Sequence, residues 1–465
     1  MMRYACLCLL MSVTLLASSA LAVDEAKAQS SEAHSFTILA IGDTGEANLD
    51  LFRNALGINK ATNDRDHKDR SALLFLGDNF YKHGLADESA SARERLFHDI
   101  YGRWFESSFA ALRNGKATGT TDPSAEPSGP AGAPGTQGVY PRVHAIAGNH
   151  DYYSKEASKE ILSALPLGFT TLGNEYEESR PEWVYHHQYP SDAYWELKGE
   201  NDSAPQAGRK AVQAIFVDST LLVRSTWTTT CRDSARARPD KGKEIEWLSC
   251  AQRLRQRDDL IALLTKYPRD SVWRVLVTHH PLHTVGSHGG ARWAAPGEVV
   301  GDEREPCSLP QRPLGHFANS FDPEDLCTEG SEKYRELVLD TIQKTGVPVQ
   351  AVLSGHDHSL QLLTLDRVCA GRQPCPAVQI VSGAGAKTTV VKKSNLPHYV
   401  TAMRSGEKAR GKSKAGWVAL RFSAEEIEVR FYSGEQDITK EMAAESSIVL
   451  DADGRPRSWQ PDQAQ

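Results

Sequence analysis

The stretch LLFLGDNFY, residues 73–81, joins a run of apolar residues to a polar loop. Its first half has the composition of a strand that is buried on both faces. Asp78 follows this apolar run after one glycine, and Tyr81 follows three residues later. In open α/β sheets, sites assemble at the carboxyl ends of the strands. The stretch therefore predicts a core strand that delivers polar side chains to a functional edge of a sheet.

Further short apolar runs of the same kind occur along the chain, and helical patterns separate several of them. Near-continuous hydrophobic strands that alternate with helices predict an α/β fold whose sheet is covered on both faces. A last pair of runs, GWVALRFSAEEIEVRFYS (416–433), predicts an antiparallel hairpin. The predicted strands lie at 35–42, 71–77, 142–148, 211–218, 272–278, 349–355 and 377–383, and the predicted helices at 91–105, 243–267 and 331–346.

Length and composition indicate a globular protein with one catalytic domain. The chain has 465 residues, 40% of them hydrophobic, which is enough for a large packed core. The formal net charge of -7 provides no basic surface, so we expect no nucleic-acid partner. We assign the catalytic domain to residues 36–435, with a Pro/Gly/Ser-rich flexible insertion at 117–138. Residues 23–35 and 436–465 are predicted to be tails.

The N-terminus has the layout of a secretory signal peptide. Arg3 precedes an apolar run, and small residues ending in Ala20-Leu21-Ala22 follow it. This arrangement predicts a signal peptide at residues 1–22 and a secreted or periplasmic protein. The alternative is an uncleaved membrane anchor, since the apolar run is nearly long enough to span a bilayer. After cleavage we expect no stable membrane span.

Outside the predicted signal peptide the chain contains six cysteines, an even number that suits an oxidising compartment. None of them has the Cys-x-x-Cys spacing of a zinc site. They fall into three local couples, each around a polar, loop-like stretch, and we therefore predict local disulfides. The couples are Cys231 with Cys250, Cys307 with Cys327, and Cys369 with Cys375.

Side chains of the metal-ligand type follow five of the predicted strands. A single aspartate after a glycine is more often a turn or cap residue, and a single histidine more often satisfies a local hydrogen bond. The repetition at five strand ends favours a shared metal site. Two cations about 3.5–4 Å apart can stabilise both the attacking and the leaving oxygen of a phosphoryl displacement, and Asp78 is the natural bridge between them. The strand-end residues are Asp43, Asp78, Asn149 with His150 and Asp151, His279 with His280, and His356 with His358.

Five sequence blocks carry these residues: GDTG (42–45), GDNFY (77–81), GNHD (148–151), the His-His-Pro of VTHHP (277–281) and GHDH (355–358). In this order they resemble the five blocks of the calcineurin-like metallophosphoesterases, and more closely those of the small purple acid phosphatases of the mammalian tartrate-resistant type. The resemblance extends over roughly residues 36–435. It implies an α/β fold, α+β in some schemes, in which a four-layer β-sandwich is flanked by helices and the metals lie at the strand carboxyl ends.

One contrast within the blocks favours the purple acid phosphatases. Most metallophosphoesterases begin with Asp-x-His, so that a histidine completes the first metal site. This chain has Gly45 at that position, and glycine offers no ligand. In purple acid phosphatases the tyrosine of Gly-Asp-x-x-Tyr fills the position, and here that residue is Tyr81. The chain departs from the family at Thr44, where tryptophan is usual, but this position is not a ligand.

The resemblance implies two ligand sets that share Asp78. Three anionic oxygens in the first set suit a trivalent ion, and the amide and two imidazoles of the second suit a divalent one. The family implies Fe(III) beside Fe(II), Zn(II) or Mn(II). In the fourth block His280 also fits the family pattern, but the register of Pro281 favours His279. The first set is Asp43, Asp78, Tyr81 and His358, and the second is Asp78, Asn149, His279 and His356.

The same resemblance implies an acid phosphatase. A metal-bound hydroxide at the binuclear Fe(III)-M(II) centre would attack phosphomonoesters. His150 and His288 are candidates to protonate the leaving alkoxide, and Asp151 could orient His150. For each of these two histidines, a solvent-exposed loop residue without a catalytic role is the alternative.

We expect small phosphorylated substrates or phosphoproteins as partners, and a monomer. A phosphodiesterase or nucleotidase of the same superfamily is an alternative function, and a secreted metal- or phosphate-binding protein without turnover is an alternative of another class. The basic stretch 225–244 aligns with a loop that restrains mammalian-type enzymes until it is cut. The alternative, which such a composition favours, is a solvated run of charges.

Overall fold

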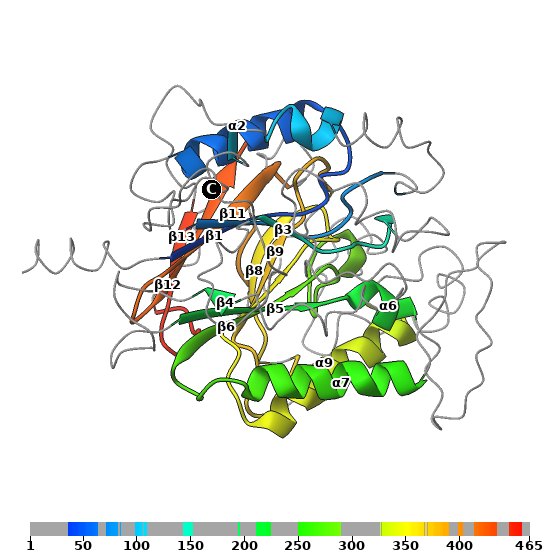
Figure 1. Ribbon diagram of the computed structural model, residues 1–465, viewed down its shortest axis with the longest axis vertical. Helices are drawn as coiled ribbons and strands as arrows, with labels where there is room; N and C mark the ends of the chain where they lie inside the picture. Colours follow the sequence, from blue (N-terminus) through cyan, green and yellow to red (C-terminus); the bar gives the residue numbers. More distant parts are fainter. Residues whose placement is uncertain are drawn as a thin grey trace, which may run out of the picture.

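Two mixed β-sheets pack face to face in the computed structural model, and helices cover both outer surfaces (Figure 1). Within the described part of the chain, one sheet has six strands and the other seven. The structure describes residues 36–63, 71–81, 84, 98–105, 107–108, 143–151, 194–195, 211–224, 250–289, 326, 328–366, 368–369, 371–389, 399–402, 413–434 and 446–457.

The first sheet consists of β1 (Phe36–Ile41), β2 (Ser71–Phe75), β3 (Val143–Ala145), β11 (Gly416–Phe422), β12 (Ile427–Ser433) and β13 (Ser446–Leu450). Its strand order is β13-β12-β11-β1-β2-β3. The three N-terminal strands are parallel, and the three C-terminal strands extend the sheet with each strand antiparallel to its neighbour. β11 and β12 form the hairpin predicted at 416–433.

The second sheet consists of β4 (Tyr194–Trp195), β5 (Ala211–Val217), β6 (Val272–Thr278), β7 (Ala351–Ser354), β8 (Leu360–Thr364), β9 (Val378–Ser382) and β10 (Tyr399–Ala402). Its strand order is β10-β8-β9-β7-β6-β5-β4. The central strands β5, β6, β7 and β9 are parallel, whereas β4, β8 and β10 are antiparallel to their neighbours. The parallel strands of both sheets therefore offer carboxyl ends from which a site can be built.

The strand sequences are continuously apolar because both faces of each sheet are covered. Alternate residues of a strand point to opposite faces. Along β1, Ile38 and Ala40 lie in the core between the sheets. Leu39 and Ile41 lie in a second core, beneath helices. A strand with one exposed face would instead alternate apolar and polar residues.

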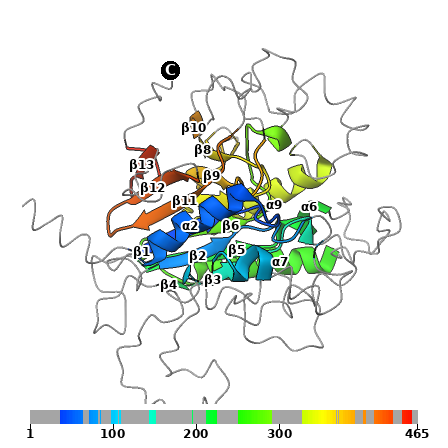
Figure 2. The same cartoon turned by 90° about the horizontal axis from the view of Figure 1, so that it is seen from above.

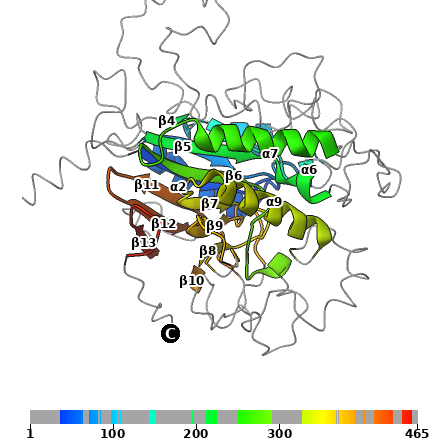
Figure 3. The same cartoon turned by 90° about the horizontal axis from the view of Figure 1, so that it is seen from below.

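Helices complete the two outer layers. α2 (Leu49–Asn63) and the π-helical turn η2 (His98–Gly102) cover the first sheet, and Figure 2 shows α2 lying over it. α6 (Ser219–Arg224), α7 (Cys250–Thr265) and α9 (Glu329–Thr345) cover the second sheet, as Figure 3 shows for the two longer helices. This arrangement confirms the predicted α/β fold with four layers.

The predicted elements occur, with differences in extent. All seven predicted strands are present, and the helix predicted at 331–346 is α9. α9 begins after Thr328, whose side chain accepts a hydrogen bond from the N–H of Ser331, and ends at Gly346 with φ of 67°. The helix predicted at 243–267 is confirmed over Cys250–Thr265. In place of the α-helix predicted at 91–105, the described part contains the π-helical turn at 98–102.

The prediction of a C-terminal tail at 436–465 is wrong in part. β13 pairs with β12, and its residues Ile448 and Leu450 lie in the core between the sheets. Both side chains are apolar and alternate in sequence, which is the pattern of a strand at the sheet edge. The signal peptide 1–22, the tail 23–35, the insertion 117–138 and the basic stretch 225–244 lie outside the described residues.

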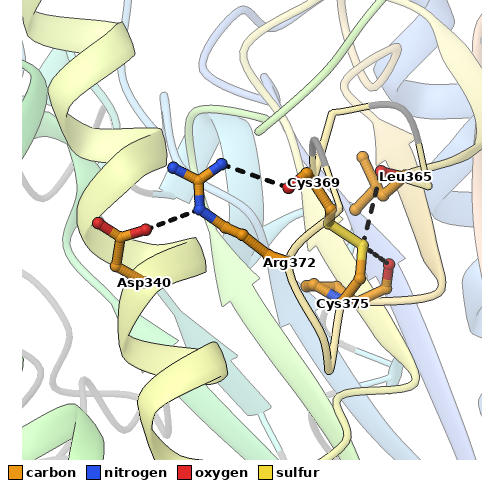
Figure 4. Close-up of a disulfide and its surroundings, with 6 residues drawn as sticks. Asp340, Leu365, Cys369, Arg372 and Cys375 are labelled. Carbon is orange, nitrogen blue, oxygen red and sulfur yellow. Dashed lines mark hydrogen bonds and ion pairs between the residues drawn. A yellow bond between two sulfur atoms is a disulfide. The ribbon is translucent and has the colours of Figure 1, made fainter.

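One predicted disulfide is present, between Cys369 and Cys375 (Figure 4). Within the loop that it closes, Nε of Arg372 donates a 2.7 Å hydrogen bond to Asp340 of α9. The other two predicted couples include cysteines outside the described residues. No helix in the described ranges combines the length and the apolar composition that a membrane span needs.

Candidate metal centre

Loops from the carboxyl ends of both sheets are tied together by backbone hydrogen bonds. The N–H of Gly42, after β1, donates to the carbonyl of Ser382, at the end of β9, over 2.7 Å. The N–H of Gly355, after β7, donates to the carbonyl of His279, after β6, over 3.1 Å. The two sheets therefore present their strand ends to one common site.

Three of the predicted ligands have a strained backbone. Asp43, Asp78 and His356 have φ values of 57°, 53° and 65°. Side-chain-bearing residues rarely adopt this left-handed conformation, and where they do the residue is often at a functional site. The backbone N–H of His356 donates to Oδ2 of Asp43 over 2.8 Å. The strain therefore belongs to a tightly connected arrangement of strand-end loops.

Asp43, Tyr81 and His358 form one group of side chains, here termed the tyrosine cluster. The hydroxyl of Tyr81 donates to Oδ1 of Asp43 over 3.1 Å. The same hydroxyl oxygen lies 3.1 Å from Nε2 of His358. Nε2 of His358 lies 3.5 Å from Oδ1 of Asp43. Three potential ligand atoms from the ends of β1, β2 and β7 thus meet.

Gly45 makes room for the loop that carries Tyr81. The N–H of Gly45 donates to the carbonyl of Asp78, and the N–H of Tyr81 donates to the carbonyl of Gly45, each over 3.0 Å. A Cβ atom at Gly45 would lie 2.6 Å from the backbone nitrogens of Phe80 and Tyr81. Side chains do not approach so closely, so a histidine at this position would displace the tyrosine loop.

Asn149, His279 and His356 form a second group, here termed the asparagine cluster. Oδ1 of Asn149 lies 2.9 Å from Nε2 of His279. The same oxygen lies 3.2 Å from Nδ1 of His356. All three residues are buried. The ends of β3, β6 and β7 supply these atoms.

Asp78 lies between the two clusters. Its Oδ1 is 3.3 Å from Nε2 of His279, in the asparagine cluster. Burial, followed by the charges of Asp43 and Asp78, raises the pKa of Tyr81 well above its usual value. A carboxylate oxygen of Asp78 also lies within 4.8 Å of one of Asp43, in the tyrosine cluster. Asp78 is therefore close to both clusters, as a bridging carboxylate must be.

The hydrogen bonds of His279 show that the asparagine cluster suits a cation. Nδ1 of His279 lies 2.8 Å from the carbonyl oxygen of Leu76. A carbonyl oxygen can only accept, so neutral His279 carries its proton on Nδ1. The lone pair of Nε2 then faces the oxygens of Asn149 and Asp78, which are acceptors too. A histidine oriented by a carbonyl in this way is the usual form of a metal ligand.

The electrostatics of the tyrosine cluster point to a cation as well. Burial raises the pKa of Asp43 to about 7. Burial lowers the pKa of His358 to about 4, which leaves its imidazole neutral and able to bind a metal. A bound cation would favour the carboxylate and phenolate forms that burial disfavours. The residues of this cluster therefore fit a bound metal cation.

In the described part of the chain, two groups of three residues bring one potential ligand atom from each residue within 4.8 Å of one another. One group is Asp43, Asp78 and His279, and the other is His279, His280 and His356. One ring nitrogen of His280 is directed to another partner, because its Nδ1 lies 3.0 Å from Oγ of Ser219. Between the two histidines of the fourth block, the structure thus places His279 against Asn149 and Asp78.

The two candidate acids lie beside different clusters. The ring of His150 packs edge to face against Tyr81, with 4.5 Å between the centroids. Its backbone N–H donates to Oδ1 of Asp78 over 2.8 Å. The ring of His288 lies 4.1 Å from that of His356 and 6.3 Å from that of His358. Both histidines are partly exposed, so a substrate could reach them.

The prediction that Asp151 orients His150 is wrong. The carboxylate of Asp151 accepts hydrogen bonds from the backbone N–H groups of Asn79, Phe80 and Gly148, at 2.9, 3.1 and 2.8 Å. Within the described residues, its hydrogen bonds come from these backbone groups and from the side-chain amide of Asn79, at 3.0 Å. Asp151 therefore ties the loop after β3 to the loop after β2.

Sequence reasoning missed two charged residues at the site. Nζ of Lys387, in the loop after β9, lies 3.2 Å from the centroid of the Tyr81 ring and 3.6 Å from Oε2 of Glu46. Lys387 is not a metal-ligand type and lies five residues beyond the end of β9, so the pattern of strand-end ligands does not reveal it. Asp357 stands between the predicted ligands His356 and His358 and received no role in the sequence analysis. Its carboxylate contacts Thr284, and no local sequence signal reveals this.

Comparison with known families gives one match. A model described as calcineurin-like phosphoesterase matches residues 36–360. This range is more than half of the 465 residues and includes both clusters. Members of this family are phosphoester hydrolases that bind divalent metals. Among the curated proteins, none matches the chain significantly.

Solved structures show distant similarity. GAP50, described as the anchor in the inner membrane complex of Plasmodium, is 12% identical, with 90% of this chain and 89% of that chain covered and a TM-score of 0.48. PhoD is 11% identical, with 92% of this chain and 73% of that chain covered and a TM-score of 0.40.

Proposed function

The protein belongs to the calcineurin-like phosphoesterase family, and we propose that it is an acid phosphatase of the purple type within that family. Its substrates are small phosphomonoesters or phosphoproteins. It acts as an exported monomer, in keeping with the signal-peptide pattern at residues 1–22. The centre holds Fe(III) beside Fe(II), Zn(II) or Mn(II).

The packing of Gly45 against the Tyr81 loop carries this proposal. Asp-x-His relatives place an imidazole where this chain has Gly45. Here a Cβ at that position would lie 2.6 Å from the backbone nitrogen of Tyr81, and the Tyr81 hydroxyl instead lies 3.1 Å from both Asp43 and His358. A phenol oxygen beside the carboxylate of Asp43 and the imidazole of His358 favours a hard trivalent ion such as Fe(III).

The two clusters give each metal a distinct setting. Asp43, Tyr81 and His358 would hold the trivalent ion, Asn149, His279 and His356 the divalent one, and Asp78 would bridge them. A metal pair supplies Lewis-acid stabilisation of the phosphoryl oxygens and a water nucleophile that is active in acid. The burial of the asparagine cluster, together with that of Asp43 and Asp78, limits bulk water at the centre and strengthens electrostatic stabilisation.

His150 and His288 supply the proton that the leaving alkoxide needs. A histidine has a pKa near neutrality and is protonated in acid, so an enzyme that depends on it as an acid works best at low pH. His150 is held by its backbone bond to Asp78, over 2.8 Å. His288 is held against His356, with 4.1 Å between the ring centroids.

Hydrolysis of p-nitrophenyl phosphate by the metal-replete protein, across acidic, neutral and alkaline pH, tests the function. We expect turnover that is strongly reduced in Asp78→Asn. With an alkyl phosphate, whose leaving group needs the proton, we expect turnover to be fastest in acid. The same assay with bis(p-nitrophenyl) phosphate separates the alternatives, because a faster diester reaction would favour a phosphodiesterase. Absence of turnover on both esters would contradict an enzyme and favour a binding protein.

A further inference from the structure

The carboxylate of Asp357 contacts the turn that follows β6. Asp357 is fully buried, and its Oδ2 accepts a 2.6 Å hydrogen bond from the hydroxyl of Thr284. Its Oδ1 accepts from the backbone N–H of Ser287 at 3.2 Å and from the hydroxyl of Thr389 at 3.4 Å. Thr389 lies after β9. One carboxylate therefore joins the loops that follow β6, β7 and β9.

The hydroxyl proton of Thr284 is committed to Asp357. Nε2 of Gln361 donates to the Thr284 oxygen over 2.8 Å, and the backbone N–H of Gly286 donates to it over 3.1 Å. Both are donors, so the single hydroxyl proton serves the carboxylate. The turn also closes tightly around Asp357, because a Cβ at Gly286 would overlap the carboxylate.

The turn held in this way carries His288. The short helix η6 (Ser287–Gly289) begins at the residue whose N–H binds Asp357. The His288 ring lies against His356 and close to His358, with centroid separations of 4.1 and 6.3 Å. These two histidines flank Asp357 in the sequence. Any shift of the turn relative to Asp357 would therefore move His288 relative to both of them.

We propose that Asp357 is a positioning residue that fixes His288 where it can protonate the departing alkoxide. This role rests on the proposed phosphomonoesterase function. The oxygen of water forms the new bond to phosphorus while the bond from phosphorus to the ester oxygen breaks. The imidazolium of His288 gives its proton to the alkoxide, which leaves as the alcohol. The proton lost by the attacking water restores the imidazolium.

Two monoesters with different leaving groups test this role in Asp357→Asn. An alkyl alkoxide needs a proton to depart, whereas p-nitrophenolate leaves without one. Because general acid catalysis contributes about 10²–10⁴-fold, we expect kcat for an alkyl phosphate to fall by about tenfold or more. The kcat for p-nitrophenyl phosphate should change far less. In a His288→Asn background, Asp357→Asn should cause no further loss on the alkyl ester. Equal losses on both esters, or additive losses, would overturn the proposal.

A measurement without turnover tests the positioning itself. In the full-length, Zn(II)-loaded protein labelled at the histidine rings, His288→Gln assigns the His288 signals by NMR. The nearby His356 ring, whose plane is tilted by 37° from that of His288, shifts these signals by ring current. Thr284→Val should remove this shift, while Thr284→Ser should retain it. Asp340→Asn, which affects an exposed carboxylate bound to Arg372, is the matched control and should change nothing.

Unchanged His288 signals in both Thr284→Val and Asp357→Asn would overturn the positioning role. If the wild-type protein hydrolyses neither ester, the proposed function fails. The NMR comparison still decides whether Asp357 fixes His288, so the two failures are distinguishable.

Discussion

The hydroxyl oxygen of Tyr81 lies 3.1 Å from Nε2 of His358, although the two residues are 277 positions apart in the sequence. Tyr81 follows β2 of the first sheet, and His358 follows β7 of the second. Their meeting depends on the face-to-face packing of the two sheets, and Asp43 lies beside both. The fold therefore assembles the tyrosine cluster from distant segments.

Gly45→Ala should weaken metal binding at the tyrosine cluster. The added Cβ would lie 2.6 Å from the backbone nitrogens of Phe80 and Tyr81, so the loop must move. Overpacking of this kind costs about 1–3 kcal/mol in the free energy of unfolding. Urea unfolding and metal titration measure the two effects.

The matched comparison for Gly45→Ala is the double variant with Tyr81→Phe. If the alanine acts by displacing the tyrosine, it should reduce metal affinity less when the hydroxyl is already absent. An unchanged metal affinity in Gly45→Ala alone would show that the packing of this glycine does not hold Tyr81 in place.

Lys387→Met should weaken the binding of inorganic phosphate. The ammonium lies above Tyr81, 3.2 Å from the ring centroid, and adds positive charge where an anion would approach the centre. Because such a partly exposed charge contributes up to about 1 kcal/mol, we expect Kd to rise by up to about fivefold. Calorimetric titration of the metal-loaded protein measures Kd.

Two variants control the Lys387 experiment. Lys387→Arg keeps the charge and should restore most of the affinity. Lys266→Met removes a lysine that also lies above a tyrosine ring, 5.4 Å from the centroid of Tyr267, but after α7. A similar loss of phosphate affinity in Lys266→Met would mean that net charge, rather than the position of Lys387, is responsible.

Asp151→Ala should destabilise the whole domain. The change leaves the buried N–H groups of Asn79, Phe80 and Gly148 without their acceptor. Each buried group left unpaired costs about 1–3 kcal/mol, so we expect a loss of about 3 kcal/mol or more in the free energy of unfolding. Asp258→Ala is the control, because its partner Arg257 is exposed and the expected change is within about 0.5 kcal/mol. Similar urea midpoints for the two variants would contradict the tie between the loops.

Loss of the disulfide between Cys369 and Cys375 should reduce stability without affecting the centre. The bond closes a loop with a sequence separation of 6, and in the chain-entropy description such a loop contributes about 2 kcal/mol. The Cys369→Ser, Cys375→Ser double variant should therefore unfold at lower urea and bind the same amount of metal. Loss of metal would show that this loop supports the site.

The strand-end residues could be predicted from the sequence because each one follows its strand directly in the chain. Asp78 after β2 and His279 after β6 need no long-range information. The assembly of each sheet does need such information, since β1 pairs with the distant strand β11 through contacts such as Ile38 with Leu420. The partition into two sheets, and the inclusion of β13, could therefore not be predicted from local patterns.

α2 was missed because its buried face is not apolar throughout. Asn54 and Thr62 are buried on it, together with Gly57. Nδ2 of Asn54 donates to the carbonyl of Gly385 over 2.8 Å, which satisfies a polar group that a periodicity pattern counts as exposed. The hydrogen bonds of Asp151 to the loop after β2 were also missed, because a local sequence pattern carries no information about partners in another loop.

The visible absorption spectrum of the Fe(III)-loaded protein, compared between wild type and Tyr81→Phe, tests the central claim most directly. A phenolate bound to Fe(III) transfers charge to the metal and absorbs visible light. We expect an absorption band in the wild type that is lost in Tyr81→Phe at equal iron content. A colourless iron-loaded wild type, or a band that persists without the hydroxyl, would contradict Tyr81 as an iron ligand.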